Sequence, residues 1–100
     1  MTANLNTFPT VLISNYCKLN QVQELSLFGS AARGELTVES DLDILVEFAP
    51  EANIGFMTLG RMARELSEIL GRNVDLVPKD GLKPLLRSAV LAEAKVLFAA

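Results

Sequence analysis

The chain has 100 residues, a formal net charge of -3 at pH 7, 50% hydrophobic residues and 21% charged residues. This length and composition exclude a disordered chain, and we expect one globular domain over residues 1–100. The acidic balance argues against direct binding of nucleic acid or of an anionic membrane surface, because both need a cationic face. One cysteine and no histidine exclude an internal disulfide and imidazole chemistry. Any chemistry must therefore rest on carboxylates, hydroxyls and cations.

The apolar runs of the sequence are short and interrupted. A membrane-spanning helix needs about 20 apolar residues, and a secretory signal needs a basic start before an apolar stretch. Because the chain has neither pattern, we expect a soluble, cytoplasmic protein without a membrane partner.

Apolar spacing predicts alternating helical and extended segments. In chain order, the expected elements are a helix over 9–19, a strand over 24–28, a short helix over 31–33, a strand over 42–48, a helix over 55–70, a strand over 73–77, a helix over 82–91, and a tail that is either an edge strand or a helix extension. This order predicts an α/β (α+β) fold with a small mixed sheet and helices packed mainly on one face.

The strand predicted over 42–48 is the clearest in the chain. Its apolar residues alternate from Leu42 to Phe48, so Asp41 and Asp43 project from the opposite face, roughly 7 Å apart along the backbone. Two neighbouring carboxylates repel each other unless a cation lies between them, and Mg²⁺ and Mn²⁺ prefer such oxygen ligands. The pattern therefore predicts a site for a divalent cation.

Asp75 lies in the strand predicted over 73–77. If this strand lies beside the strand over 42–48 and shares its core, Asp75 emerges on the same face as Asp41 and Asp43. Two metal ions held by such acids can bind a triphosphate and lower the pKa of an attacking hydroxyl. We therefore name all three aspartates as candidate catalytic residues and metal ligands, with Asp75 either the base or a further ligand.

Gly29 and Ser30 follow the strand over 24–28 and open the predicted short helix. Backbone N–H groups at such a turn can point at an anion, and glycine permits close approach of a phosphate. Arg33, about one helical turn further on, either contacts phosphate oxygens or anchors the acidic loop at Glu35 or Glu39. These three residues are the candidate nucleotide-binding residues. A turn of this kind followed by alternating acids indicates metal-dependent nucleotidyl transfer.

The segment LFGSAARGELTVESDLDILVEF closely resembles the signature of the DNA polymerase β-like nucleotidyltransferase superfamily, in its minimal MNT-type form. Ten residues separate Ser30 from Asp41, the SDxD element is Ser40-Asp41-Leu42-Asp43, and the ARG element is Ala32-Arg33-Gly34. The resemblance implies a nucleotidyltransferase fold. It also implies that Gly29 and Ser30 hold the triphosphate, that Asp41 and Asp43 bind Mg²⁺, and that Asp75 is the third carboxylate.

The resemblance further implies a partner. Minimal members of this family are commonly encoded beside a HEPN-type toxin and act as its antitoxin, some by transferring AMP from ATP to a tyrosine of the toxin. The short chain leaves no room for a separate substrate domain, so we expect a partner or a second subunit to share substrate recognition. The expected ligands are ATP and one or two Mg²⁺ ions, for which Mn²⁺ can substitute.

Two alternatives to a protein-modifying enzyme remain open. The same fold could neutralise a toxin simply by covering its surface, and the high apolar content favours such an interface. Transfer onto a small-molecule hydroxyl is the other alternative. The nucleotide preference, the acceptor residue and the oligomeric state do not follow from the sequence.

Overall fold

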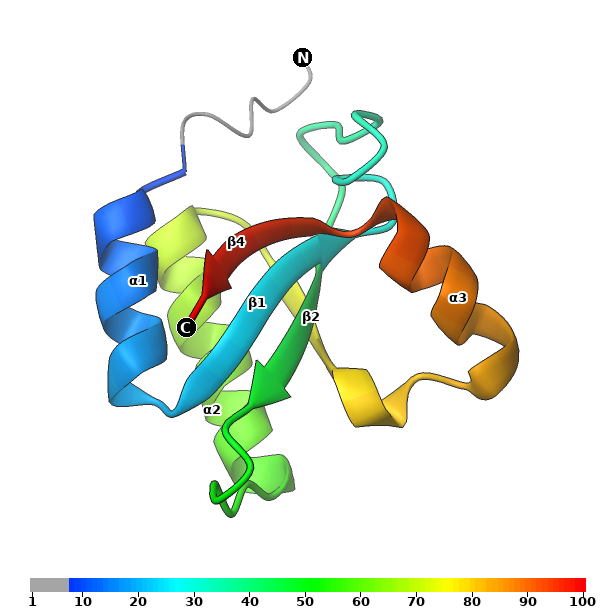
Figure 1. Cartoon of the computed structure of the whole chain (residues 1–100). Helices are drawn as coiled ribbons and strands as arrows, with labels where there is room; N and C mark the ends of the chain where they lie inside the picture. The colour runs from blue at the N-terminus through cyan, green and yellow to red at the C-terminus, as the bar shows by residue number, and fades with distance from the viewer. Residues whose placement is uncertain (1–7) are drawn as a thin grey trace.

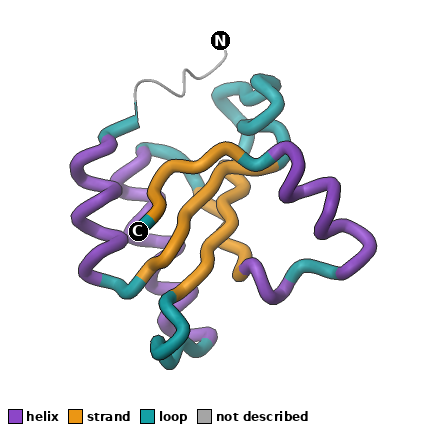
Figure 2. Tube along the Cα trace, in the orientation of Figure 1, coloured by secondary structure: helices purple, strands orange, loops and turns teal. Residues whose placement is uncertain are grey.

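The computed structural model describes residues 8–100. Its elements are α1 (Thr10–Leu19), β1 (Val22–Phe28), β2 (Leu42–Phe48), α2 (Phe56–Leu70), β3 (Val74–Pro78), the 3-10 turn η2 (Lys79–Gly81), α3 (Pro84–Glu93) and β4 (Lys95–Ala99). The strands form one sheet in the order β3-β2-β1-β4 (Figures 1 and 2). β1 pairs antiparallel with β2 and β4, whereas β2 and β3 are parallel. The predicted mixed sheet is therefore confirmed, and the C-terminal tail is its edge strand.

The hydrophobic core lies between the sheet and the helices α1 and α2, which cover one face (Figure 1). Ile13 and Cys17 of α1 and Met62 and Leu66 of α2 are fully buried against the strands. Burial raises the pKa of the Cys17 thiol to about 11, so Cys17 behaves as a small apolar side chain. Packing of two helices on one face confirms the predicted layer arrangement.

The helix α2 has clear sequence signals at both ends. Gly55 precedes its first residue, and Gly71 ends it in the left-handed conformation with φ 71°, which glycine adopts at low cost. In the sequence, apolar residues recur at helical spacing from Phe56 to Leu70, which predicts one apolar stripe that faces the sheet, and this stripe is confirmed in part. Met62, Leu66 and Leu70 are buried, but Phe56, which we expected on the stripe, is 93% exposed because the first turn extends beyond the core.

One local expectation is wrong. Residues 31–33 form turns and no short helix, because the chain reverses again at Gly34, which has φ +73°. The acidic face of β2 also carries a buried apolar side chain, since Leu45 is 3% exposed beside the buried Ser26 of β1.

The helix α3 lies apart from the two-helix layer (Figure 1). It falls wholly within the described part of the chain, and none of its residues is buried. Leu85 and Leu86 are 95% and 55% exposed. Within residues 8–100, no helix is both long and apolar enough to cross a membrane.

Replacing Leu66 by Ala tests the core. Leu66 is 0% exposed, so the substitution should leave a cavity and lower the free energy of unfolding by about 2–5 kcal/mol. Leu85→Ala is the matched control, because Leu85 is 95% exposed and its truncation should change stability by less than about 0.5 kcal/mol. Urea denaturation of both variants measures the difference, and equal losses would contradict the assigned core.

Candidate active site

The glycine turn lies directly beside the paired acids. Phe28, the last residue of β1, pairs with Asp43 of β2, so the chain turns at Gly29 next to the Asp43 side chain. A Cβ atom placed on Gly29 would lie 2.5 Å from Asp43 Oδ2, and Gly29 has φ +67°. Both the close approach and the backbone conformation therefore require glycine at this position.

The three aspartates lie on, or directly before, two neighbouring strands. Asp43 and Asp75 are direct partners in the parallel pairing of β2 with β3. The condition on which the expectation for Asp75 depended is therefore met, and Asp75 emerges on the same face as Asp43. Asp41 immediately precedes β2 and is exposed, as is Asp75, whereas Asp43 is half-buried. The structure thus places all three residues at the same end of β2 and β3.

The electrostatics of this cluster centre on Asp43. Burial raises the pKa of the Asp43 carboxyl, and the charges of Asp75 and Asp41 raise it further, while Arg33 lowers it. Like charges held together disfavour ionisation, and a bound cation relieves this cost. The oxygen-only donors and their mutual repulsion therefore fit Mg²⁺. As the side chains stand, however, no three acids in residues 8–100 form a ready-made metal-binding group.

The turn from Gly29 to Glu35 is held by its own backbone. The Arg33 N–H donates to the Gly29 carbonyl at 3.2 Å, and the Glu35 N–H donates to the Ser30 carbonyl at 2.9 Å. Ala31 and Ala32 are buried beneath it. Since no helix follows, anion binding here would depend on N–H groups of the turn itself and on side chains, with no helix dipole behind them.

Arg33 contacts two acidic side chains, as expected if it anchors the acidic loop. Its Nε donates to Glu35 Oε1 at 2.9 Å, and its Nη1 donates to both carboxylate oxygens of Glu93, at 3.2 and 3.3 Å. Glu93 Oε1 also accepts from the Gly29 N–H at 3.1 Å. Of the two partners that the sequence offered, Glu35 and Glu39, the structure shows the contact with Glu35. The sequence missed Glu93, because no local pattern links the end of α3 to a turn 64 residues earlier.

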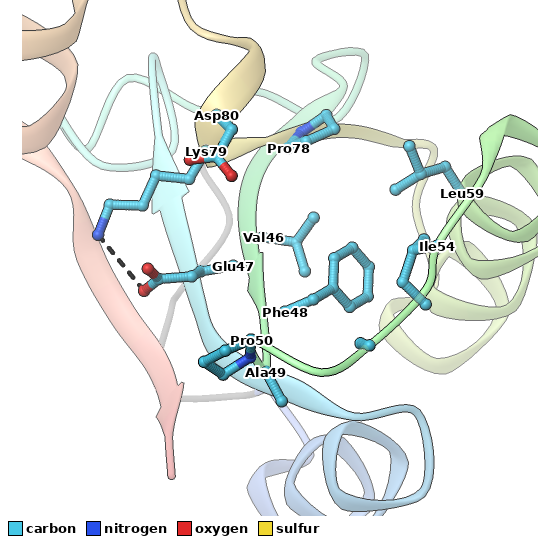
Figure 3. Close-up of a pocket in the computed structure, with 11 residues that line it drawn as sticks. Val46, Glu47, Phe48, Ala49, Pro50, Ile54, Leu59, Pro78, Lys79 and Asp80 are labelled. Atoms are coloured by element: carbon cyan, nitrogen blue, oxygen red, sulfur yellow. Dashed lines mark hydrogen bonds and ion pairs between the residues drawn. The ribbon is translucent and has the colours of Figure 1, made fainter.

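A pocket of about 410 Å³ lies at the other end of β2 and β3 (Figure 3). Its walls include Phe48, Ile54 and Leu59, and an ion pair between Lys79 Nζ and Glu47 Oε1, 3.5 Å apart, lies at its side. The aspartates stand at the start of both strands and do not line it. The pocket is therefore separate from the candidate active site.

A mixed sheet that carries aspartates on adjacent strands beside a glycine turn defines a phosphate-handling enzyme of the nucleotidyltransferase class. The nucleotidyltransferase domain model matches residues 12–97. A Methanocaldococcus jannaschii relative, named provisionally as a protein adenylyltransferase, is 38% identical over 91% of this chain and 95% of its own length. The protein adenylyltransferase MntA of Thermococcus cleftensis is 40% identical over 72% of this chain and 71% of its own length. This chain belongs to the nucleotidyltransferase domain family and is a nucleotidyltransferase.

Solved structures share the fold. A toxin–antitoxin crystal structure with AMP-PNP matches with a TM-score of 0.75 at 25% identity, over 94% of this chain and 74% of that chain. A structure assigned provisionally as a minimal nucleotidyltransferase matches with a TM-score of 0.72 at 36% identity, over 86% of both chains. A complex of tri-AMPylated Shewanella oneidensis HEPN toxin with MNT antitoxin matches at 24% identity, over 91% of this chain and 73% of that chain, with a TM-score of 0.61. At that identity the last match concerns the fold alone.

Gly29→Ala tests the close approach at the turn. The added Cβ should displace the Asp43 carboxylate, because it would lie 2.5 Å from Oδ2, and nucleotidyl transfer should fall by at least about tenfold. Gly34→Ala is the control, since Gly34 also has positive φ, +73°, but nothing lies within 4 Å of its added Cβ. Both variants should lose roughly 1 kcal/mol of stability to backbone strain. Equal transfer rates in the two variants would contradict the role of the approach.

Asp43→Asn should stabilise the metal-free protein at neutral pH. An acid whose pKa is raised by folding binds its proton more tightly in the folded state, so its ionised form costs stability. The advantage of the variant should shrink as the pH falls through the raised pKa of Asp43 and vanish below the pKa of an unfolded aspartate. Thermal unfolding of wild type, Asp43→Asn and the exposed loop control Glu51→Gln, from pH 7 down to pH 3, measures it. A less stable Asp43→Asn variant at pH 7 would contradict the assigned repulsion.

Proposed function

We propose that this nucleotidyltransferase transfers AMP from ATP to a tyrosine hydroxyl of a HEPN-type toxin, with Mg²⁺ as cofactor, and so acts as an antitoxin. The observation that carries the proposal is the placement of Asp43, paired with Asp75, against the Gly29 turn. This arrangement puts a candidate phosphate-binding segment next to candidate metal ligands. The names of the relatives, which are protein adenylyltransferases, support a protein acceptor, and the related toxin–antitoxin structure with AMP-PNP supports a toxin partner and ATP.

The residues of the chain divide into two groups in this proposal. Asp41 and Asp43 would hold Mg²⁺, which would offset the charge of the triphosphate and polarise the attacked phosphate. Gly29 and Ser30 would bind phosphate oxygens through backbone N–H groups and the serine hydroxyl. The positive φ of Gly29 and its lack of a side chain support this role, because they open the turn to a large anion.

The proposed reaction is an in-line displacement at the α-phosphorus of ATP. The tyrosine oxygen forms a bond to the α-phosphorus, the bond from that phosphorus to the bridging oxygen of the β-phosphate breaks, and pyrophosphate leaves with the bonding electrons. The hydroxyl proton passes to a carboxylate. Asp75 is the candidate for this base because it is exposed and lies beside Asp43.

Several large apolar side chains are exposed outside the site. Leu85 and Leu86 of α3, and Phe56 and Met57 at the start of α2, are large apolar side chains with more than half of their surface exposed. Such side chains favour a protein interface over a solvent-facing surface. This observation equally supports the second candidate function, in which the chain neutralises a toxin by binding alone.

The catalytic proposal predicts a metal-dependent label transfer. With labelled ATP, Mg²⁺ and a HEPN-type toxin, wild type should label the toxin. Asp43→Asn should lower the rate on the order of a hundredfold or more, because the variant loses a carboxylate that would hold the metal ion at the reacting phosphates. Asp80→Asn, which removes an exposed acid from η2, is the matched control and should retain full activity.

Two outcomes distinguish the candidate functions. Absence of labelled toxin with wild type, or label that persists in an Asp41→Asn, Asp43→Asn double variant, would refute the catalytic proposal. Protection of cells by that double variant as complete as by wild type would show that binding alone suffices. Mutation of the labelled tyrosine to Phe should abolish labelling, and persistent labelling would move the acceptor to another residue.

A further inference from the structure

The carboxylate of Glu93 accepts hydrogen bonds at the turn where the proposed function puts the triphosphate. Its Oε1 accepts hydrogen bonds from the Gly29 N–H at 3.1 Å and from Arg33 Nη1 at 3.2 Å, and its Oε2 lies 3.3 Å from the same nitrogen. A backbone N–H and a guanidinium are the donors that bind phosphate oxygens in proteins. The carboxylate therefore uses the donors that a phosphate would need.

We propose that Glu93 is a built-in competitor of the nucleotide: its carboxylate occupies the Gly29 and Arg33 donors and must leave them before the phosphates of ATP can bind. This inference rests on the proposed function, since it takes the turn to be the triphosphate site. It adds a residue from the far end of the chain that sets nucleotide affinity.

The position of Glu93 in the fold makes exchange by its side chain alone feasible. Glu93 is the last residue of α3, and Lys95, two residues later, already pairs with Leu27 in the sheet. The β4 pairing fixes the nearby backbone, so the carboxylate stays within reach of the turn. Its side chain has several rotatable bonds, and it can leave the turn without any movement of the sheet.

The ion pair between Arg33 and Glu93 is weak enough for a ligand to displace the Glu93 carboxylate. The side chains of Arg33 and Glu93 are 47% and 31% exposed, so water screens their attraction. Exposed ion pairs of this kind contribute little to stability, whereas a triphosphate presents several charges to the same donors. A polyphosphate should therefore displace Glu93 at a small cost in affinity.

The chain offers a matched control for the charge of Glu93. Glu35 also pairs with Arg33, through Nε at 2.9 Å, but its side chain is 61% exposed. The backbone N–H of Gly29 donates to Glu93, whereas the contact of Glu35 is with Arg33. If any negative charge near Arg33 weakens nucleotide binding, Glu35→Gln and Glu93→Gln should act alike. If occupancy of the turn matters, only Glu93→Gln should act strongly.

Binding of a fluorescent ATP analogue with Mg²⁺ tests the proposal without any transfer step. Glu93→Gln should bind about threefold to fivefold more tightly than wild type, the size expected for loss of an exposed ion pair, and Glu35→Gln should change the affinity by less than about twofold. Inorganic tripolyphosphate, measured by its competition with the analogue, should show the same gain in affinity for Glu93→Gln, because Glu93 competes with the phosphates and not with the base. Glu93→Asp, which withdraws the carboxylate by one methylene, should show an intermediate gain and serves as the second variant if Glu93→Gln folds poorly.

The outcomes separate this inference from the proposed function. Unchanged or weaker binding in both Glu93 variants, or an equal gain in Glu35→Gln, would overturn the competitor role while ATP binding itself stands. If neither wild type nor any variant binds the analogue or tripolyphosphate, the proposed nucleotide site fails and the inference fails with it. Melting temperatures of all variants, measured alongside, establish that affinity is compared among folded proteins.

Discussion

The parallel pairing of β2 with β3 is the interaction on which the candidate site depends. The hydrophobic core stabilises this pairing, because Leu42 and Val74 are direct partners in it and are both buried against the helices. One residue further along each strand, strict alternation turns Asp43 and Asp75 to the other face. A slip of one residue would bury these acids and expose the core, so burial of apolar side chains fixes the position of the carboxylates.

The Gly29 turn adds a second constraint to the same place. The antiparallel pairing of β1 with β2 brings the turn to Asp43, and only a residue without a side chain fits there at positive φ. The cost of this arrangement is electrostatic, since Asp43 is half-buried near two other aspartates. Sites that bind and activate charged substrates commonly hold such like charges together, because the ligand supplies the opposite charge.

Much of the site could be predicted because its signals are local. The acids of β2 alternate with buried leucine and isoleucine, and the glycine turn interrupts an apolar strand, so short stretches of sequence define both. The same reasoning failed at two places. The segment 31–33 lacks a helix because the chain reverses at Gly34, and Phe56 lies outside the core because the first turn of α2 extends beyond the sheet layer. Helical spacing predicts which face of a helix is apolar, but the extent of the core decides which of those residues are buried.

The sequence by itself determined the order of helices and strands, the face of β2 that carries acids, the phase of Asp75 and the glycine turn, because hydrophobic periodicity and backbone preferences act over a few residues. Tertiary structure alone decided that β3 pairs in parallel with β2, that the tail becomes β4, and that Glu93 reaches Gly29 and Arg33. These features join segments many residues apart. Their geometry depends on how the whole core packs, and no local pattern in the chain encodes it.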